Sequence, residues 1–162
     1  MERPTGVLLD IDGTLVDSND AHAHAWVKAL AEVGVNAEFA TVRRLIGKGG
    51  DKLLPEVSGI DAESSKGKAV GKRRGEIFRK EYLPKLKPTP GAKELLARMK
   101  KAGLELAVAS SAKEDELKGL LKVCGADEFI TASTSSDDAP NSKPDPDIVH
   151  AALDELGHPK ER

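Results

Sequence analysis

The length, charge and cysteine content of the chain exclude several classes of protein. Its 162 residues, with a mass of 17.2 kDa, suffice for one ordinary domain or for a core with a small lobe. The 25 Lys and Arg nearly balance the 27 Asp and Glu, so the charge favours neither nucleic acid nor a membrane as a partner. There is no apolar run near the roughly 18 residues of a membrane span and no signal-peptide pattern. Because the single cysteine, Cys124, also fits a reducing compartment, we expect a cytoplasmic protein.

The first half of the chain predicts one strand followed by helices. Residues 6–11 are apolar and predict a buried strand. The first helix begins at Asp17 or Ser18 and ends before Gly34. Apolar residues at helical spacing predict helices over 18–33, 37–47 and 62–82, with a shorter stretch at 53–57. The prolines between residues 84 and 90 predict a linker.

Helices and strands alternate in the rest of the chain. The periodicity predicts helices over 92–101, 114–123 and 145–156, and strands over 104–109 and 129–131. This alternation is typical of a parallel α/β sheet. The sequence therefore predicts an α/β fold with a Rossmann-like parallel sheet. An all-helical block is inserted into it directly after the first strand.

Two carboxylates stand at the end of the first predicted strand. Asp10 and Asp12 are two residues apart, and residues i and i+2 of a strand point to the same side. The two side chains can therefore serve one site. Acidic side chains are costly in a core and useful in chemistry. The alternative is a plain Asp-Gly turn with two solvated acids.

A serine and a lysine accompany the later predicted strands. Ser110 directly follows the run 104–109, and Lys143 precedes the last predicted helix. Ligands bind at the carboxyl ends of strands in such sheets, so we expect both to converge on Asp10. A carboxylate nucleophile, a second acid, a hydroxyl and an ammonium are together suited to attack on phosphorus. Taken alone, Ser110 could simply end a strand, Ser111 could act in its place, and Lys143 could be an ordinary surface lysine.

Together these segments resemble the haloacid dehalogenase superfamily of phosphohydrolases. Residues 10–14, Asp-Ile-Asp-Gly-Thr, look like its first motif, and the strand that ends at Ser110 looks like its second. Residues 143–146, Lys-Pro-Asp-Pro, look like the third. The helical block looks like the cap of the subfamily that includes phosphoglycolate phosphatase and beta-phosphoglucomutase. The resemblance implies a core of residues 1–15 and 89–162 and a helical cap of residues 16–88.

The resemblance also implies roles for the acidic pair. Asp10 would be the nucleophile that forms an aspartyl-phosphate, and Asp12 would be the acid for the leaving group and then the base for water. The Asp10 carboxylate and the Asp12 carbonyl would bind Mg²⁺, which prefers oxygen ligands. Thr14 would steady the segment around Asp12. The implied activity is Mg²⁺-dependent hydrolysis of a phosphate monoester of a small metabolite.

The phosphoryl and substrate contacts come from further residues. By the same resemblance, Ser110 and Lys143 would bind the phosphoryl group, with Ser111 as the alternative to Ser110. His22 matches a position where related phosphomutases and phosphatases often carry a His near the site, and the alternative is that it has no functional role. Lys48 lies in a glycine-rich loop, where it could meet an anionic group of the substrate or remain solvated between two helices.

One motif of the family has no counterpart in the sequence. The fourth motif, an acidic pair at the end of a further strand, would begin shortly after a segment like residues 156–162. We therefore expect a C-terminally incomplete member whose metal site lacks its downstream carboxylates. Its first strand would form an exposed hydrophobic edge that favours aggregation or pairing. The expected state is a monomer or a weak homodimer.

Other functions stay open at this point. A sugar phosphomutase of the same family would use the same residues. A non-catalytic phosphate-binding fragment would agree with the absent fourth motif. A receiver of the response-regulator type also uses Asp, Mg²⁺, Ser or Thr and Lys, but the helical insert after the first strand argues against it.

Overall fold

The computed structural model describes residues 4–157 and divides the chain into two compact units. The first, the core unit, combines Met1–Asp17 with Lys87–Arg162, and the second, the helical unit, is Ser18–Leu86. The inserted block predicted from the sequence, residues 16–88, begins and ends two residues outside the helical unit. The chain thus leaves the core unit once and returns to it once.

Within residues 4–157, the core unit is built on a parallel sheet of three strands. They are β1 (Gly6–Leu9), β2 (Glu105–Ala109) and β3 (Ala132–Thr134), and β2 lies in the middle. β2 is buried from Leu106 onwards, as expected for a parallel strand covered on both faces. The predicted α/β fold with a parallel sheet is confirmed.

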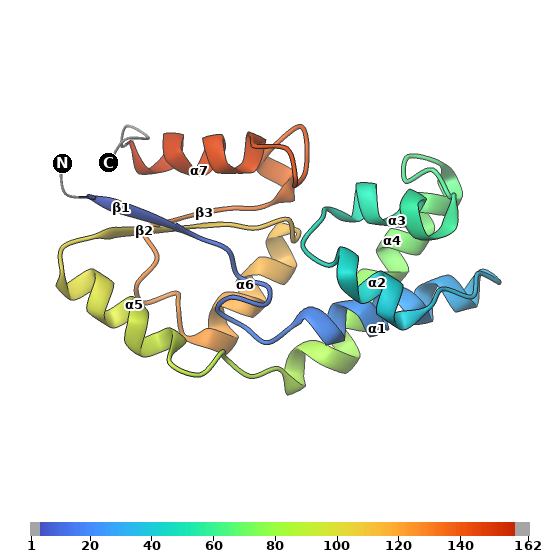
Figure 1. Ribbon diagram of the computed structural model, residues 1–162, viewed down its shortest axis with the longest axis horizontal. Coiled ribbons are helices and arrows are strands. Elements are labelled where there is room, and N and C mark those ends of the chain that lie inside the picture. Colours follow the sequence, from blue (N-terminus) through green and yellow to red (C-terminus); the bar gives the residue numbers. More distant parts are fainter. Residues whose placement is uncertain (1–3, 158–162) are drawn as a thin grey trace. The chain divides into compact units, whose positions relative to one another are not determined.

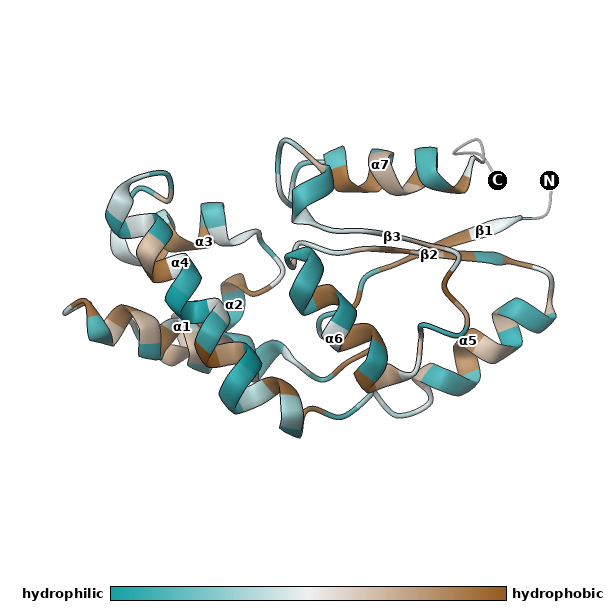
Figure 2. Ribbon diagram, turned by 180° about the vertical axis from the view of Figure 1, so that it is seen from behind, coloured by the Kyte–Doolittle hydropathy of each residue, from teal (hydrophilic) through white to brown (hydrophobic). Residues whose placement is uncertain are grey.

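The helices of the core unit cover both faces of this sheet. α7 (Asp147–Leu156) lies on one face, whereas α5 (Ala92–Lys101) and α6 (Glu114–Cys124) lie on the other (Figure 1). α7 turns its hydrophobic side toward the strands (Figure 2), where Ile148 packs with Ala109 of β2. Removing these apolar side chains from water stabilises the layers, and it explains the apolar strands of the sequence.

The third strand lies three residues later than predicted. The sequence favours a strand at 129–131 because Phe129 and Ile130 are apolar, but β3 occupies Ala132–Thr134. The N–H groups of Phe129 and Ile130 both donate to the carbonyl of Ala126, over 2.8 and 3.0 Å. These bonds close a turn, so the two apolar residues cannot join the ladder with β2.

The two links between the units are hydrogen-bonded to each other where they meet the core unit. The N–H of Asp17 donates to the carbonyl of Lys87 over 3.1 Å, and the N–H of Thr89 donates to the carbonyl of Leu15 over 2.9 Å. An isolated antiparallel bridge lies between them. The outgoing and the returning chain therefore run side by side.

The helical unit consists of α-helices followed by two short helical turns (Figure 1). They are α1 (Asn19–Glu32), α2 (Phe39–Leu45), α3 (Gly50–Ser58), α4 (Ser65–Ile77), the π-helix η1 (Phe78–Tyr82) and the 3₁₀-helix η2 (Leu83–Lys85). Trp26, Leu30 and Phe78 are buried in its core. Across the described part of the chain, every helix is too short or too polar to span a bilayer.

Gly67 allows α4 to pack directly on the turn before it. A Cβ at this position would lie 2.1 Å from the carbonyl oxygen of Asp61 and 2.8 Å from backbone atoms of Ala62. No side chain fits in that space. Gly71, four residues further along α4, is different, because among the described residues no neighbouring atom lies within 4 Å of a Cβ there.

Candidate functional site

The first strand is shorter than predicted, so the acidic pair lies in the loop after it. β1 ends at Leu9, and both Asp10 and Asp12 follow the last residue of its ladder with β2. The strand predicted over residues 6–11 was therefore too long by two residues. The positions of Asp10 and Asp12 are set by the loop itself.

That loop, residues 11–16, is closed by its own backbone. The carbonyl of Ile11 accepts three N–H groups from the end of the loop, over 2.9 to 3.2 Å. The N–H of Gly13 donates to the carbonyl of Val16 over 2.8 Å, at a positive φ of 73° that favours glycine. Ile11 and Val16 are buried and anchor the loop in the core. Asp12 is therefore held in a rigid turn directly after Asp10.

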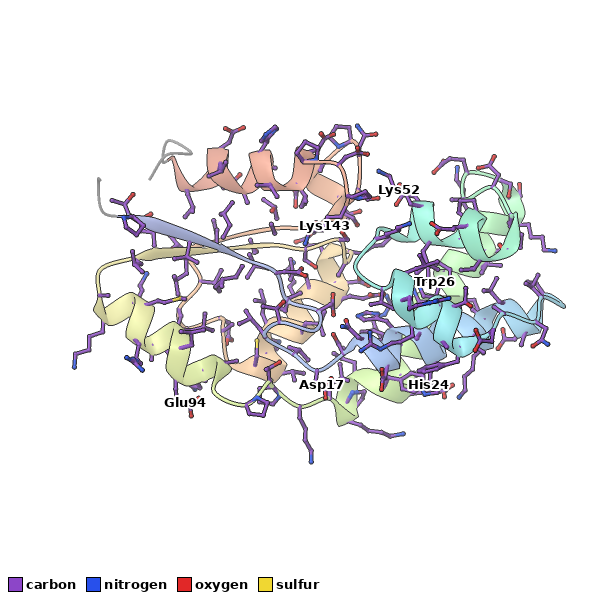
Figure 3. All side chains as sticks on the ribbon, in the orientation of Figure 1. Asp17, His24, Trp26, Lys52, Glu94 and Lys143 are labelled. Carbon is purple, nitrogen blue, oxygen red and sulfur yellow. The ribbon has the colours of Figure 1, made fainter. Side chains whose placement is uncertain are left out.

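Lys143 joins the end of β1 to the end of β2. Its Nζ donates to Oδ1 of Asp10 and to the carbonyl oxygen of Ala109, each over 2.8 Å. Asp10 and Ala109 stand level because Leu9 pairs with Val108. Figure 3 shows Lys143 in the segment that leads into α7. The side chains of Lys143 and Asp10 are 22% and 41% exposed, so the pair is partly shielded yet open to a ligand.

Two serine hydroxyls follow the end of β2. Ser110 is fully buried, and its N–H continues the sheet by donating to the carbonyl of Thr134 over 3.0 Å. Its Oγ accepts the N–H of Ala112 over 3.0 Å, so the hydroxyl proton remains able to donate elsewhere. The Oγ of Ser111 is buried and has no hydrogen-bond partner among the described residues. Unpaired buried hydroxyls are uncommon, so the Ser111 hydroxyl, like the remaining proton of Ser110, is suited to bind a ligand.

Three other predicted site residues have contacts or exposure of their own. Thr14 is exposed in the loop after β1. His22 is buried in the helical unit and stacks on Phe78, with ring centroids 3.9 Å apart. The Nζ of Lys48 donates to Oε2 of Glu56 over 2.6 Å. The stacking of His22 on Phe78 and the bond of Lys48 to Glu56 both lie within the helical unit.

The predicted metal ligands form a small set of oxygen atoms. Within residues 4–157, no group of three or more His, Cys, Asp or Glu side chains could hold a metal ion. Asp10 offers a carboxylate and Asp12 a backbone carbonyl. Mg²⁺ keeps several waters and is usually bound by one or two carboxylates together with substrate phosphate. This donor set therefore fits Mg²⁺ better than an ion that requires a closed cage of protein ligands.

The sequence did not predict that the turn after β3 contacts the segment that follows β2. Oδ2 of Asp137 accepts the N–H of Glu114 at the start of α6, over 3.1 Å. Since 23 residues separate the two, this contact has no local signal. Ser135 and Asp138, by contrast, form a capping box, whose spacing is readable in a sequence.

Known proteins match the chain over nearly its whole length. A family model described as haloacid dehalogenase-like hydrolase matches residues 7–162. Protein SUPPRESSOR OF QUENCHING 1, chloroplastic, from Arabidopsis thaliana is 35% identical over 97% of this chain. Phosphoglycolate phosphatase from Pseudomonas syringae pv. tomato is 30% identical over 96% of it. The chain spans 15% of the first protein and 59% of the second, less than two thirds of either.

A solved structure shares the fold. CbbY from Rhodobacter sphaeroides, in complex with phosphate, matches with a TM-score of 0.81 and 27% sequence identity. The match covers 99% of this chain and 76% of that one.

Proposed function

Because this chain belongs to the haloacid dehalogenase-like hydrolase family, we propose that it carries the active site of a Mg²⁺-dependent phosphatase. The substrate would be a phosphate monoester of a small metabolite. The observation that supports this most directly is the Nζ of Lys143 between the Asp10 carboxylate and the Ala109 carbonyl. It provides a positive charge where a phosphoryl group would meet a carboxylate.

In the proposed reaction, Asp10 attacks the phosphorus of the ester. One carboxylate oxygen forms a bond to phosphorus while the bond to the ester oxygen breaks, which gives an aspartyl-phosphate. Oδ1 is held by Lys143, so Oδ2 is the atom that attacks. The charge of Lys143 offsets the negative charge that gathers around Asp10.

Asp12 moves the protons in both halves of the reaction. It donates a proton to the departing ester oxygen and then accepts one from the water that attacks the aspartyl-phosphate. Phosphate leaves, and the Asp10 carboxylate is restored. The closed loop 11–16 supports this role, because a rigid turn keeps the carboxyl in one place. Thr14, in the same loop, would steady it.

The phosphoryl oxygens need hydrogen-bond donors. Ser110 is suited to this, since the N–H of Ala112 occupies one acceptor position of its Oγ and leaves its proton to donate. Ser111 is the alternative donor, because its Oγ has no partner in the described residues. Lys143 completes the set with an ammonium.

Mg²⁺ would be held by the Asp10 carboxylate and the Asp12 carbonyl. When bound, it would polarise a phosphoryl oxygen and help to orient the ester. Two residues of the helical unit remain predictions from the sequence alone. They are Lys48, as a contact to an anionic part of the substrate, and His22, as a residue near the site.

A screen for phosphate release tests the proposal. Phosphorylated metabolites are incubated with this chain and with a form extended past Arg162, each with and without Mg²⁺. We expect Mg²⁺-dependent release of phosphate, which Asp10→Asn abolishes. Asp17→Asn is the matched control, since Asp17 is exposed and is bonded to Lys87 through its backbone N–H, which asparagine keeps.

Other outcomes point to other functions. Normal turnover in the Asp10→Asn variant would exclude Asp10 as the nucleophile. Conversion of a phosphosugar into an isomer without release of phosphate would identify a phosphomutase. Binding of phosphate without turnover in either form would identify a binding module.

A further inference from the structure

The turn after β3 is bonded to the turn after β2 at two points. Oδ2 of Asp137 accepts the N–H of Glu114 over 3.1 Å. The N–H of Ser136 donates to the carbonyl of Ala112 over 2.9 Å. Both acceptor–donor pairs connect 3₁₀-helix η3 (Ser136–Asp138) to the segment that contains the two serines of the proposed site.

The start of α6 is capped from a distance. Its N-cap residue is Lys113, whose side chain makes no capping hydrogen bond. Asp137 supplies that bond from another loop. The first turn of α6 already holds three acidic residues, so the helix dipole does not need more negative charge. What Asp137 adds is a fixed hydrogen bond between the two loops.

Asp137 is itself held in place. The N–H and the Oγ of Ser135 both donate to Oδ2 of Asp138, each over 2.8 Å. The N–H of Asp137 donates to the Oγ of Ser135 over 3.2 Å. Ser135 is buried, so this capping box anchors the turn, and Asp137 projects from a rigid base.

The bonds from η3 reach Ser110, the serine proposed to bind the phosphoryl group, through one residue, Ala112. Ala112 is held by Ser136 at its carbonyl, and its N–H donates to the Oγ of Ser110 over 3.0 Å. That bond decides where the Ser110 proton can point. A shift of Ala112 would therefore turn the hydroxyl away from a bound phosphoryl group.

We propose that Asp137 is a positioning residue, which holds residues 110–114 so that the Ser110 hydroxyl donates to a phosphoryl oxygen. This inference rests on the proposed function. Asp137 does not touch the reacting atoms. It acts through Glu114 and Ala112, and its contribution appears in the binding of phosphate.

The test compares three variants with inorganic phosphate as the probe, measured by calorimetry on the full chain with Mg²⁺. Asp137→Ala should weaken phosphate binding about three- to tenfold, the effect of weakening one hydrogen bond from the Ser110 hydroxyl to phosphate. Asp137→Asn should restore it, because an amide oxygen still accepts the Glu114 N–H. Glu38→Ala is the matched control, since Glu38 also accepts an N–H, that of Thr41 over 3.1 Å, at the start of a helix.

Glu38→Ala should lower the melting temperature about as much as Asp137→Ala and leave phosphate binding unchanged. Equal weakening in the Glu38 variant, or none in Asp137→Ala, would overturn the proposal. Amide hydrogen exchange gives a second answer that needs no ligand. Exchange at Ala112 and Glu114 should quicken in Asp137→Ala alone, and unchanged exchange at Ala112 would reject the positioning role. A chain that binds no phosphate would count against the proposed function, while the exchange result still decides the role of Asp137.

Discussion

Two lysine–carboxylate pairs, one in each unit, have similar lengths and different surroundings. The Nζ of Lys143 lies 2.8 Å from Asp10, and that of Lys48 lies 2.6 Å from Glu56. Lys143 is 22% exposed and also donates to a backbone carbonyl. Lys48 is 36% exposed and stands eight residues from its partner.

The difference shows that a short distance between opposite charges says little about function. Exposed pairs between near neighbours form readily, and they contribute only about 0–1 kcal/mol. Asp10 and Lys143 are 133 residues apart in the chain, so the whole core unit must fold before they meet. The pair of Asp10 and Lys143 is the one to which we assign a role in the proposed reaction.

The largest effect should come from removing the assembled pair. Lys143→Ala should lower kcat/KM for the ester found in the screen by about 10²- to 10³-fold, since a cation that stabilises the transition state is lost. Lys48→Ala should lower it by much less. Steady-state kinetics of both variants measure these losses. Equal losses of kcat/KM would mean that Lys143 contributes no more to the reaction than the surface residue Lys48.

The second effect concerns the free energy of unfolding, which should depend on buried side chains much more than on exposed ones. Leu96 and Leu95 are neighbours on α5, but Leu96 is fully buried, whereas Leu95 is 47% exposed. Leu96→Ala should lower the free energy of unfolding by about 3 kcal/mol, because it opens a cavity in the core. Leu95→Ala should cost less than about 1 kcal/mol. Urea denaturation of both variants measures this, and similar midpoints would show that α5 does not pack as described.

A glycine pair sharpens the contrast within the helical unit. Gly67→Ala should destabilise the protein by about 2 kcal/mol, because the new Cβ would clash with backbone atoms. Gly71→Ala should stabilise it by about 0.5–1 kcal/mol, since α4 gains helix propensity without a clash. Thermal unfolding gives the sign of each change. Phosphate affinity should stay constant in both, and a change in it would mean that the helical unit contributes to that binding.

The smallest effect concerns an exposed ion pair. A hydrogen bond from Arg73 lowers the pKa of Glu32 in the folded protein. Because the folded pKa is lowered, the pair stabilises the fold above the ordinary pKa and stops doing so as the pH falls through the lowered value. Glu32→Gln should therefore reduce the melting temperature slightly at pH 7 and not at about pH 2.

The exposed Glu94 on α5 provides the control for that measurement (Figure 3). Glu94→Gln should leave the melting temperature nearly unchanged at both pH values. A loss at pH 7 as large as that of Glu32→Gln would show that the pair with Arg73 adds nothing specific.

The sequence predicted elements best where local pattern and packing agree. α5 has the predicted bounds of 92–101, because its apolar face is periodic and Gly103 follows it with a positive φ. β3 was misplaced because its residues, Ala132–Thr134, are small or polar. Its ladder is fixed by pairing with β2 rather than by its own composition.

The contacts of the candidate site also differ in how far the sequence could predict them. The hydrogen bond between Lys143 and Asp10 agrees with a general rule for parallel sheets, in which ligands bind at the carboxyl ends of the strands, so it could be expected without knowing any distance. The bond between Asp137 and Glu114 could not, because neither residue type nor spacing identifies a helix cap that comes from another loop. Long-range hydrogen bonds of this kind become visible only in three dimensions.

The paired links between the units make the helical unit an exchangeable insert. Backbone hydrogen bonds join Leu15 to Thr89 and Asp17 to Lys87. The chain therefore leaves the core unit and returns to it at adjacent positions. The helices of the helical unit can therefore be lengthened, shortened or replaced during evolution without shifting strands β1 to β3 of the core unit. Under the proposed function, such an exchange would leave Asp10 and Lys143, the residues of the chemical step, in place.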